Sequence, residues 1–184
     1  MKRISAIIIF CFFVLILTIQ SLAKVKFRTV EDKMEGVIWY YSKLTPKKDF
    51  YPGTKAFPYD NTILYLYIRV EESGKSFLFF RAQLEPGKSW LFFDKIKFLA
   101  DGERLELKFD KTKRKTTVFE NQPIEWYNLS VNNDILEVIK KISGSKKIEM
   151  RFYGDNGSLD KKFKKRQKKG LLDVLAGWEL LSKQ

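Results

Sequence analysis

The chain has 184 residues, with 35 Lys or Arg against 22 Asp or Glu, which gives a formal net charge of +13. It contains no His and a single Cys, Cys11. The lack of His excludes a Ser-His-Asp triad, a Cys-His pair and an imidazole metal site. A single Cys excludes an intramolecular disulfide and a cysteine-ligated iron–sulfur cluster. Cys11 lies in the apolar N-terminal run, so the rest of the chain has no thiol, and any chemistry there must come from oxygen and amine groups.

Residues 1–23 have the pattern of an export signal. Lys2 and Arg3 form a positive start, residues 4–19 are almost all apolar, and small residues occupy the two positions that a signal peptidase inspects. A helix of this apolar length spans about 24 Å, less than the ~30 Å hydrocarbon core, which favours cleavage over an uncleaved anchor. We therefore expect a signal peptide at 1–23 and a single globular β-rich domain at 24–184, periplasmic or secreted. Loss of the two signal cations lowers the net charge from +13 to +11.

Short strand patterns separated by turn residues fill the first two thirds of the expected domain. Aromatic and β-branched residues at 37–43 favour a strand, and the Pro and Gly residues within 44–61 predict a long loop. Ser73-Gly74 and Asp101-Gly102 predict hairpin turns. The expected strands are 24–30, 37–43, 62–71, 76–84, 90–100, 105–109, 116–120, 124–129 and 147–153.

Helical spacing appears only late in the chain. Apolar residues at 134–142 and at 164–181 follow the helical period, although Gly170 and Gly177 weigh against one continuous second helix. Asn132 or Asn133 is suited to cap the first helix. The fold class expected is mainly β or α+β, an antiparallel sheet or β-sandwich with two helices in the C-terminal third.

Several aromatic and turn motifs occur in an order that is known from one protein family. They are Asp32-x-x-x-Gly36-x-x-Trp39-Tyr40, Tyr65-Leu66-Tyr67-Ile68, Trp90-Leu91-Phe92, Asp101-Gly102, Glu125-Trp126, Ser145-Lys146-Lys147 and Arg151-Phe152-x-Gly154. This order resembles an uncharacterised domain family of exported bacterial proteins and lipoproteins, over most of the expected domain. The resemblance implies a bacterial, extracytoplasmic setting and, since the family has no assigned activity, no site. The lipoprotein cysteine common in that family has no counterpart here.

A basic run between 161 and 169 is the most extreme local feature. Its cations are Lys161, Lys162, Lys164, Lys165, Arg166, Lys168 and Lys169. As a binding site it would face phosphate or carboxylate groups of an anionic envelope component or an acidic protein. The alternative is a solvated helix start, where the cations oppose the helix dipole and add no stability. Further basic clusters lie at 111–115 and 140–147, and the sequence leaves open whether the clusters converge.

A second candidate site mixes aromatic rings with guanidinium groups. Tyr65, Tyr67 and Arg69 alternate on one face of the strand at 62–71, and Arg81 alternates with two Phe residues on the next strand. If both rows share a face, it could stack sugars or bases, or bind a protein. The alternative is that the late helices cover this face.

Carboxylates are the only plausible catalytic acids and bases. Asp94, Asp101, Glu120 and Glu125 flank strands, but sequence alone cannot place two of them at glycosidase distance. The oxygen-rich segment 155–160 lacks the spacing of an EF-hand calcium loop, and a hairpin turn explains it better. We therefore expect no catalytic residue, no metal ligand and no cofactor.

The first functional hypothesis is an exported, non-catalytic binding module for an anionic envelope component or an acidic protein. The alternatives are a carboxylate-based hydrolase of an envelope polymer and a structural or assembly partner. Nucleic acid is disfavoured as a ligand, and membrane contact is expected only through residues 1–23 if they are retained. The oligomeric state stays open.

Overall fold

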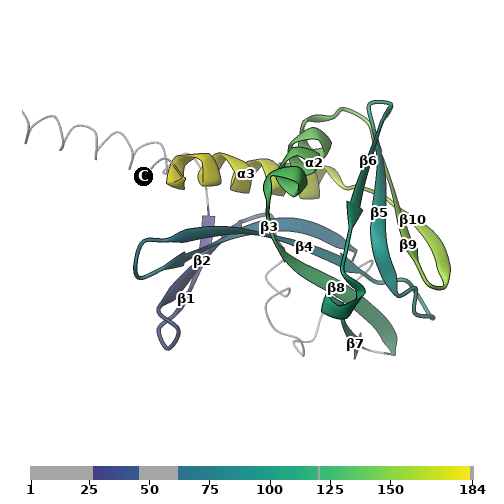
Figure 1. Cartoon of the computed structure of the whole chain (residues 1–184), viewed down its shortest axis with the longest axis horizontal. Coiled ribbons are helices and arrows are strands. Elements are labelled where there is room, and N and C mark those ends of the chain that lie inside the picture. The colour runs from purple at the N-terminus through teal and green to yellow at the C-terminus, as the bar shows by residue number, and fades with distance from the viewer. Residues whose placement is uncertain (1–26, 46–61, 120, 183–184) are drawn as a thin grey trace, which may run out of the picture.

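The computed structural model describes residues 27–45, 62–119 and 121–182 (Figure 1). The expected signal peptide and most of the expected loop at 44–61 lie outside the described residues. The elements are β1 Phe27–Asp32, β2 Val37–Ser42, β3 Ile63–Glu71, β4 Ser76–Leu84, β5 Phe93–Ala100, β6 Glu103–Lys108, the 3-10 helix η2 Lys111–Lys113, β7 Lys115–Phe119, β8 Gln122–Ser130, α2 Asn133–Gly144, β9 Ile148–Gly154, β10 Gly157–Lys161 and α3 Lys165–Leu181.

The strands form two antiparallel sheets. Sheet A has the order β1-β2-β3-β4-β8-β7, and sheet B has the order β10-β9-β5-β6. The prediction of a mainly antiparallel β fold with two helices is confirmed. Two details were wrong: β10 was not predicted, and the strand expected at 90–100 begins only at Phe93. Phe92 adopts a φ of 56°, which ends extended pairing at that residue.

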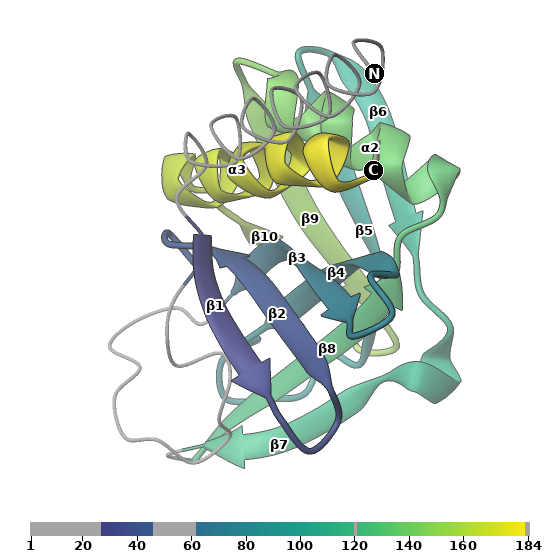
Figure 2. The ribbon, with the colours of Figure 1, turned by 90° about the vertical axis from the view of Figure 1, so that its left-hand side faces the viewer.

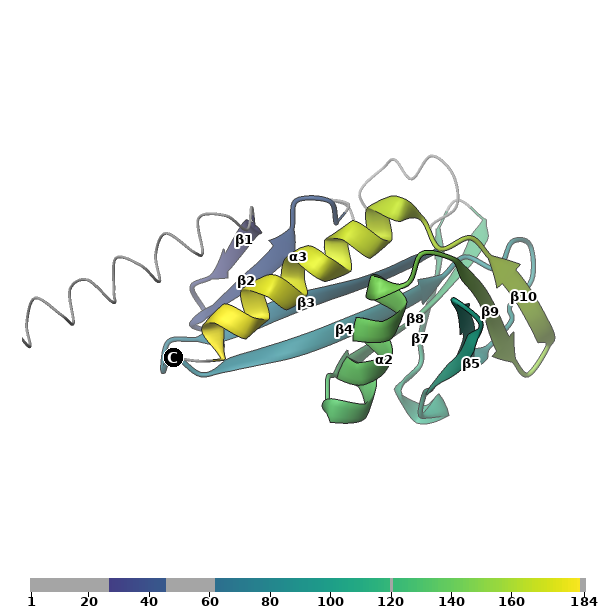
Figure 3. The same ribbon diagram turned by 90° about the horizontal axis from the view of Figure 1, so that it is seen from above.

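The main core lies between the two sheets and the two helices. On β3, Leu64, Leu66 and Ile68 face inward and are fully buried, as their alternation predicts. Figures 1 and 3 show α3 running along this inner face of sheet A. Sheet B lies at one end of the same face, near the start of α3. Figure 2 shows α2 beside α3 at one end of sheet B. One apolar cluster thus joins both sheets and both helices.

Both helices have clear local causes. The Asn132 side chain accepts a hydrogen bond from the backbone N–H of Ile135 at 2.9 Å, which confirms one of the two caps considered for α2. Helix α3 is continuous through Gly170 and Gly177. A Cβ on Gly177 would stand 2.1 Å from the ring of Phe27, so glycine there lets β1 pack against the helix. No helix of the described ranges is long and apolar enough to cross a membrane.

Among the glycines of the described ranges, Gly154 lies closest to neighbouring backbone, and this gives a stability prediction. A Cβ there would lie 2.3 Å from the carbonyl oxygen of Leu91 and 2.7 Å from the carbonyl carbon of Phe92. Gly154→Ala should therefore lower the free energy of unfolding in urea by about 1–3 kcal/mol. The control is Gly144→Ala at the end of α2, where nothing lies within 4 Å of the new Cβ. It should leave stability unchanged or raise it by up to about 1 kcal/mol. Equal stability of the two variants would contradict this packing.

Candidate functional site

The outer face of sheet A carries the predicted rings and guanidinium groups. Strand register places Tyr67 beside Phe79, Tyr65 beside Arg81 and Arg69 beside Phe77, so the two predicted rows do share a face. The prediction did not include the rings of β2. The register of β2 with β3 brings Trp39 beside Arg69 and Tyr41 beside Tyr67, on the same face. The period-2 alternation of residues 37–43 was the signal that could have found them.

Tyr67 is the centre of this face. Its ring lies 5.3 Å from that of Phe79 in a stacked arrangement, and 5.4 Å from that of Tyr41. The rings of Trp39 and Tyr65 lie 5.6 Å and 5.9 Å away. These five rings form a second apolar cluster, separate from the main core. The rings pack against one another on the face of sheet A that lies opposite the helices.

The expected alternative, in which the late helices cover this face, is wrong. Helix α3 packs on the inner face of sheet A, and the outer face has its own cluster. Tyr65 and Tyr67 are nevertheless only 5% and 8% exposed, so their rings are not open platforms. Arg69 and Arg81 are half-buried, and their guanidinium carbons lie 5.7 Å and 5.0 Å from the rings of Trp39 and Trp126. Both arginines therefore act at the rim as cation–π partners.

Burial raises the pKa of Tyr67 to about 12, and the charge of Arg81 opposes this only in part. An unfolded tyrosine ionises near pH 10. Below pH 10 both states keep the proton, so the contribution to stability is complete. Between pH 10 and 12 the unfolded chain loses its proton first, so stability falls.

Tyr67 thus predicts an alkaline stability difference. Relative to Tyr67→Phe, the wild-type protein should lose about 1.4 kcal/mol of unfolding free energy per pH unit between pH 10 and 12. Urea denaturation of both proteins across this interval measures the difference. Subtracting the unfolding free energy of Tyr67→Phe from that of the wild-type protein cancels the effect of lysines and other tyrosines that titrate in the same pH range. A difference that does not change with pH would refute the burial argument.

The basic run is divided between structural contacts and free cations. Arg166 donates from Nε to the carbonyl oxygen of Leu44 at 2.8 Å, which ties the start of α3 to the end of β2. Lys169 pairs with Asp173 at 3.2 Å on the same helix. Lys162 and Lys165 are exposed, and neither forms an ion pair within the described ranges. The remaining cations of the run are Lys161, which is half-buried at the end of β10, Lys164, the N-cap of α3, and Lys168, which contacts the end of α2.

Two of the basic clusters converge. Lys168 donates from Nζ to the carbonyl oxygen of Ser145, just past the end of α2. This contact places the start of α3 beside the cluster at 140–147. Lys165 lies one helical turn before Lys168, on the same side of α3. We define the basic patch as five lysines close in sequence to this contact: Lys146, Lys162, Lys164, Lys165 and Lys168. The contact also sets a cation at the negative end of the α2 dipole.

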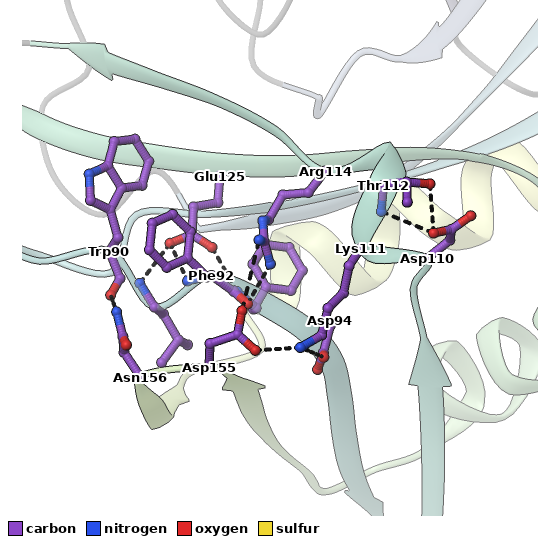
Figure 4. A network of polar contacts seen from close by, with 12 residues as sticks. Trp90, Phe92, Asp94, Asp110, Lys111, Thr112, Arg114, Glu125, Asp155 and Asn156 are labelled. Carbon is purple, nitrogen blue, oxygen red and sulfur yellow. Dashed lines mark hydrogen bonds and ion pairs between the residues drawn. The ribbon is translucent and has the colours of Figure 1, made fainter.

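The third basic cluster lies elsewhere, at the opposite end of sheet B. Lys111 pairs with both Asp155 and Asp94, the latter at 3.2 Å (Figure 4). These contacts lower the pKa of Asp155 and raise that of Lys111. Lys113 and Lys115 remain exposed there. This cluster therefore does not join the basic patch.

The candidate carboxylates have structural partners. Asp101 accepts hydrogen bonds from the backbone N–H groups of Lys147 at 2.7 Å and Lys146 at 2.9 Å, which hold its pKa below the ordinary value. Asp94 faces Lys111. Glu120 lies outside the described residues. The described residues contain no group of three or more acidic or Cys side chains arranged to hold a metal ion.

Glu125 has a structural role that the sequence analysis missed. It is fully buried on β8, where Oε1 accepts from the N–H groups of Leu91 and Phe92 at 2.7 and 2.8 Å, and Oε2 accepts from that of Phe93 at 2.8 Å (Figure 4). One carboxylate of sheet A thereby holds the chain entering sheet B. The signal for it was a charged residue two positions before Tyr127, on the inward face of a strand.

The segment held by Glu125 is stabilised from its other side by Arg114, which sequence reasoning also missed. Arg114 donates from Nη1 to the carbonyl oxygen of Phe92 at 2.7 Å, and its guanidinium lies 5.0 Å from the centre of the Phe92 ring. The Phe92 ring stacks on Trp90 at 5.7 Å. Asn156 donates to the carbonyl oxygen of Trp90 at 2.9 Å. These contacts explain how Phe92 tolerates its positive φ.

Comparisons with protein-family models, curated proteins and solved structures gave no match. The resemblance to exported bacterial proteins stays a prediction.

The hydrogen bonds of Glu125 give a further stability prediction. In Glu125→Gln one acceptor becomes an NH2 group that faces a backbone N–H, so a buried donor loses its partner. The unfolding free energy should fall by about 1–3 kcal/mol. Glu137→Gln on the exposed side of α2 is the control, with an expected change within about 0.5 kcal/mol. Thermal and urea denaturation measure both. Equal stability of the two variants would show that the carboxylate does not join the sheets.

Proposed function

We propose that this chain is an exported bacterial protein that binds an anionic polymer of the cell envelope and has no catalytic role. The observation that carries the proposal is the contact between Lys168 and Ser145, because it brings two basic segments together into the basic patch. Three of the five lysines, Lys146, Lys162 and Lys165, are exposed and form no ion pair with described residues. Asp101 interacts electrostatically with Lys146 and Lys168, so the five lysines together keep a net positive charge. Such a patch attracts phosphate or carboxylate groups from a distance.

Export through residues 1–23 is part of the proposal, and the signal pattern supports it. The ligand class follows from the same setting, since polymers and lipids that carry phosphate or carboxylate groups are anions of a bacterial envelope. Lys162 and Lys165 fit this role because their charges do not neutralise a partner within the described fold. The cations that do have partners, such as Arg166, support the scaffold instead.

The two alternatives have less support. For a carboxylate-based hydrolase, Glu125 and Asp101 would have to give up hydrogen bonds to backbone N–H groups before acting on a substrate. For an assembly partner, a continuous exposed apolar face is needed. The large exposed apolar side chains of the described ranges are instead scattered over separate elements: Met34, Ile38, Leu99, Val118 and Leu172.

Charge reversal within the patch tests the proposal. The variant Lys162→Glu/Lys165→Glu should bind polyphosphate, or vesicles containing phosphatidylglycerol, at least about tenfold more weakly than the wild-type protein at low salt. The wild-type affinity should fall as NaCl increases, because salt screens exposed charges. Vesicles of phosphatidylcholine alone should not bind. Fluorescence anisotropy and vesicle sedimentation measure these affinities.

The matched control is Lys113→Glu/Lys115→Glu, which changes the net charge equally at the opposite end of sheet B. It should retain most of the wild-type affinity. An equal loss of affinity in both double variants would show that only the net charge of the protein matters. An affinity that does not change with NaCl concentration would show that the binding is not electrostatic. Either outcome would reject the basic patch as the site.

A further inference from the structure

Sheet B has a groove on its outer face, the face turned away from the core. Lys97 and Leu99 of β5 point to this face. Ile96 and Phe98, which alternate with them along the strand, are buried. The groove has a volume of about 340 Å³. That size lies within the range of about 300–1,000 Å³ typical of small-ligand sites. Nothing in its lining belongs to the basic patch.

The charges that line the groove cancel. Its cations are Lys97, Arg104 and Arg151, and its carboxylates are Glu106, Glu149 and Asp160. A formal charge of zero is unusual on a chain whose net charge is +13. An anionic ligand would meet three carboxylates here, and a cationic ligand would meet three cations. The lining therefore favours a ligand without net charge.

Strand register holds these polar groups in place. Arg151 and Asp160 lie opposite each other on β9 and β10, and are joined by two hydrogen bonds of 2.5 and 2.8 Å. Lys97 and Glu106 are opposite on β5 and β6, with 3.8 Å between Nζ and Oε2. Paired in this way, the side chains present donors beside acceptors in fixed positions.

The groove also has an apolar part. Leu99 is 37% exposed and stands between Arg104 on β6 and Glu149 on β9. Arg104 is exposed and makes no ion pair among the described residues, so its guanidinium is available to a ligand. Tyr153 is half-buried, and the ammonium groups of two lysines of β5 lie 5.4 and 5.2 Å from its ring centre. An exposed leucine and a tyrosine thus lie among paired polar groups.

We propose that this groove binds a neutral saccharide. Each sugar hydroxyl both donates and accepts a hydrogen bond, which matches a lining of alternating donors and acceptors with no net charge. The C–H face of a pyranose ring is apolar and fits against the exposed side chain of Leu99. The site is independent of the basic patch, both in its residues and in the class of ligand.

Calorimetric titration of the purified protein with cello-, chito- and malto-oligosaccharides tests this inference. At least one series should bind saturably, with an affinity that does not change between low and high NaCl. Arg104→Ala and Leu99→Ala should each weaken that binding by about tenfold or more. Both side chains are exposed, so neither substitution disturbs the core.

Matched controls come from the same residue types outside the groove. Lys115→Ala removes an exposed cation on β7, and Leu172→Ala removes a leucine that is 43% exposed on α3. Both should bind like the wild-type protein, and so should Lys162→Glu/Lys165→Glu. Three results would overturn the inference: no heat with any neutral series, equal affinity of the groove and control variants, or an affinity that falls with salt.

Discussion

The buried carboxylate of Glu125 is the interaction on which the relative placement of the two sheets depends. A fully buried charge is stable only when polar groups surround it, and three backbone N–H groups of one short segment do so here. Because those N–H groups are fixed, Phe93 turns its ring into the core against Tyr127 at 5.2 Å and Phe152 at 5.1 Å. Sheet B, its outer groove and the turn into β10 all take their positions from this contact.

The parts that could be predicted from sequence are those with a local cause. The inward row of β3 and the Asn132 cap depend on neighbouring residues alone, and both are found as expected. Strand β10 could not be found, since residues 157–161 have one apolar side chain, Leu159, among a glycine and polar residues, and are held by pairing with β9. The contact of Lys168 with Ser145 is likewise invisible in sequence, because only the fold brings the two segments together.

Long basic side chains serve two purposes within one short run. Arg166 and Lys168 donate hydrogen bonds to backbone carbonyl oxygens just past the ends of β2 and α2. At the end of a helix such carbonyl groups have no partner within the helix. Their neighbours Lys162 and Lys165 keep their charge for a ligand. The same run therefore attaches the start of α3 to β2 and α2, and places exposed positive charges beside it. The number of cations in a segment is thus a poor guide to how many of them can bind.

The packing of the Phe27 ring against Gly177 has a consequence for the order in which the chain can fold. Strand β1 is synthesised before α3, yet each covers part of the other. Until α3 is complete, the inner face of sheet A lacks one of its main apolar covers. During synthesis from the N-terminus, the strands of sheet A therefore stay partly uncovered until residues 165–181 have been made, so this architecture requires late folding and protection of those strands.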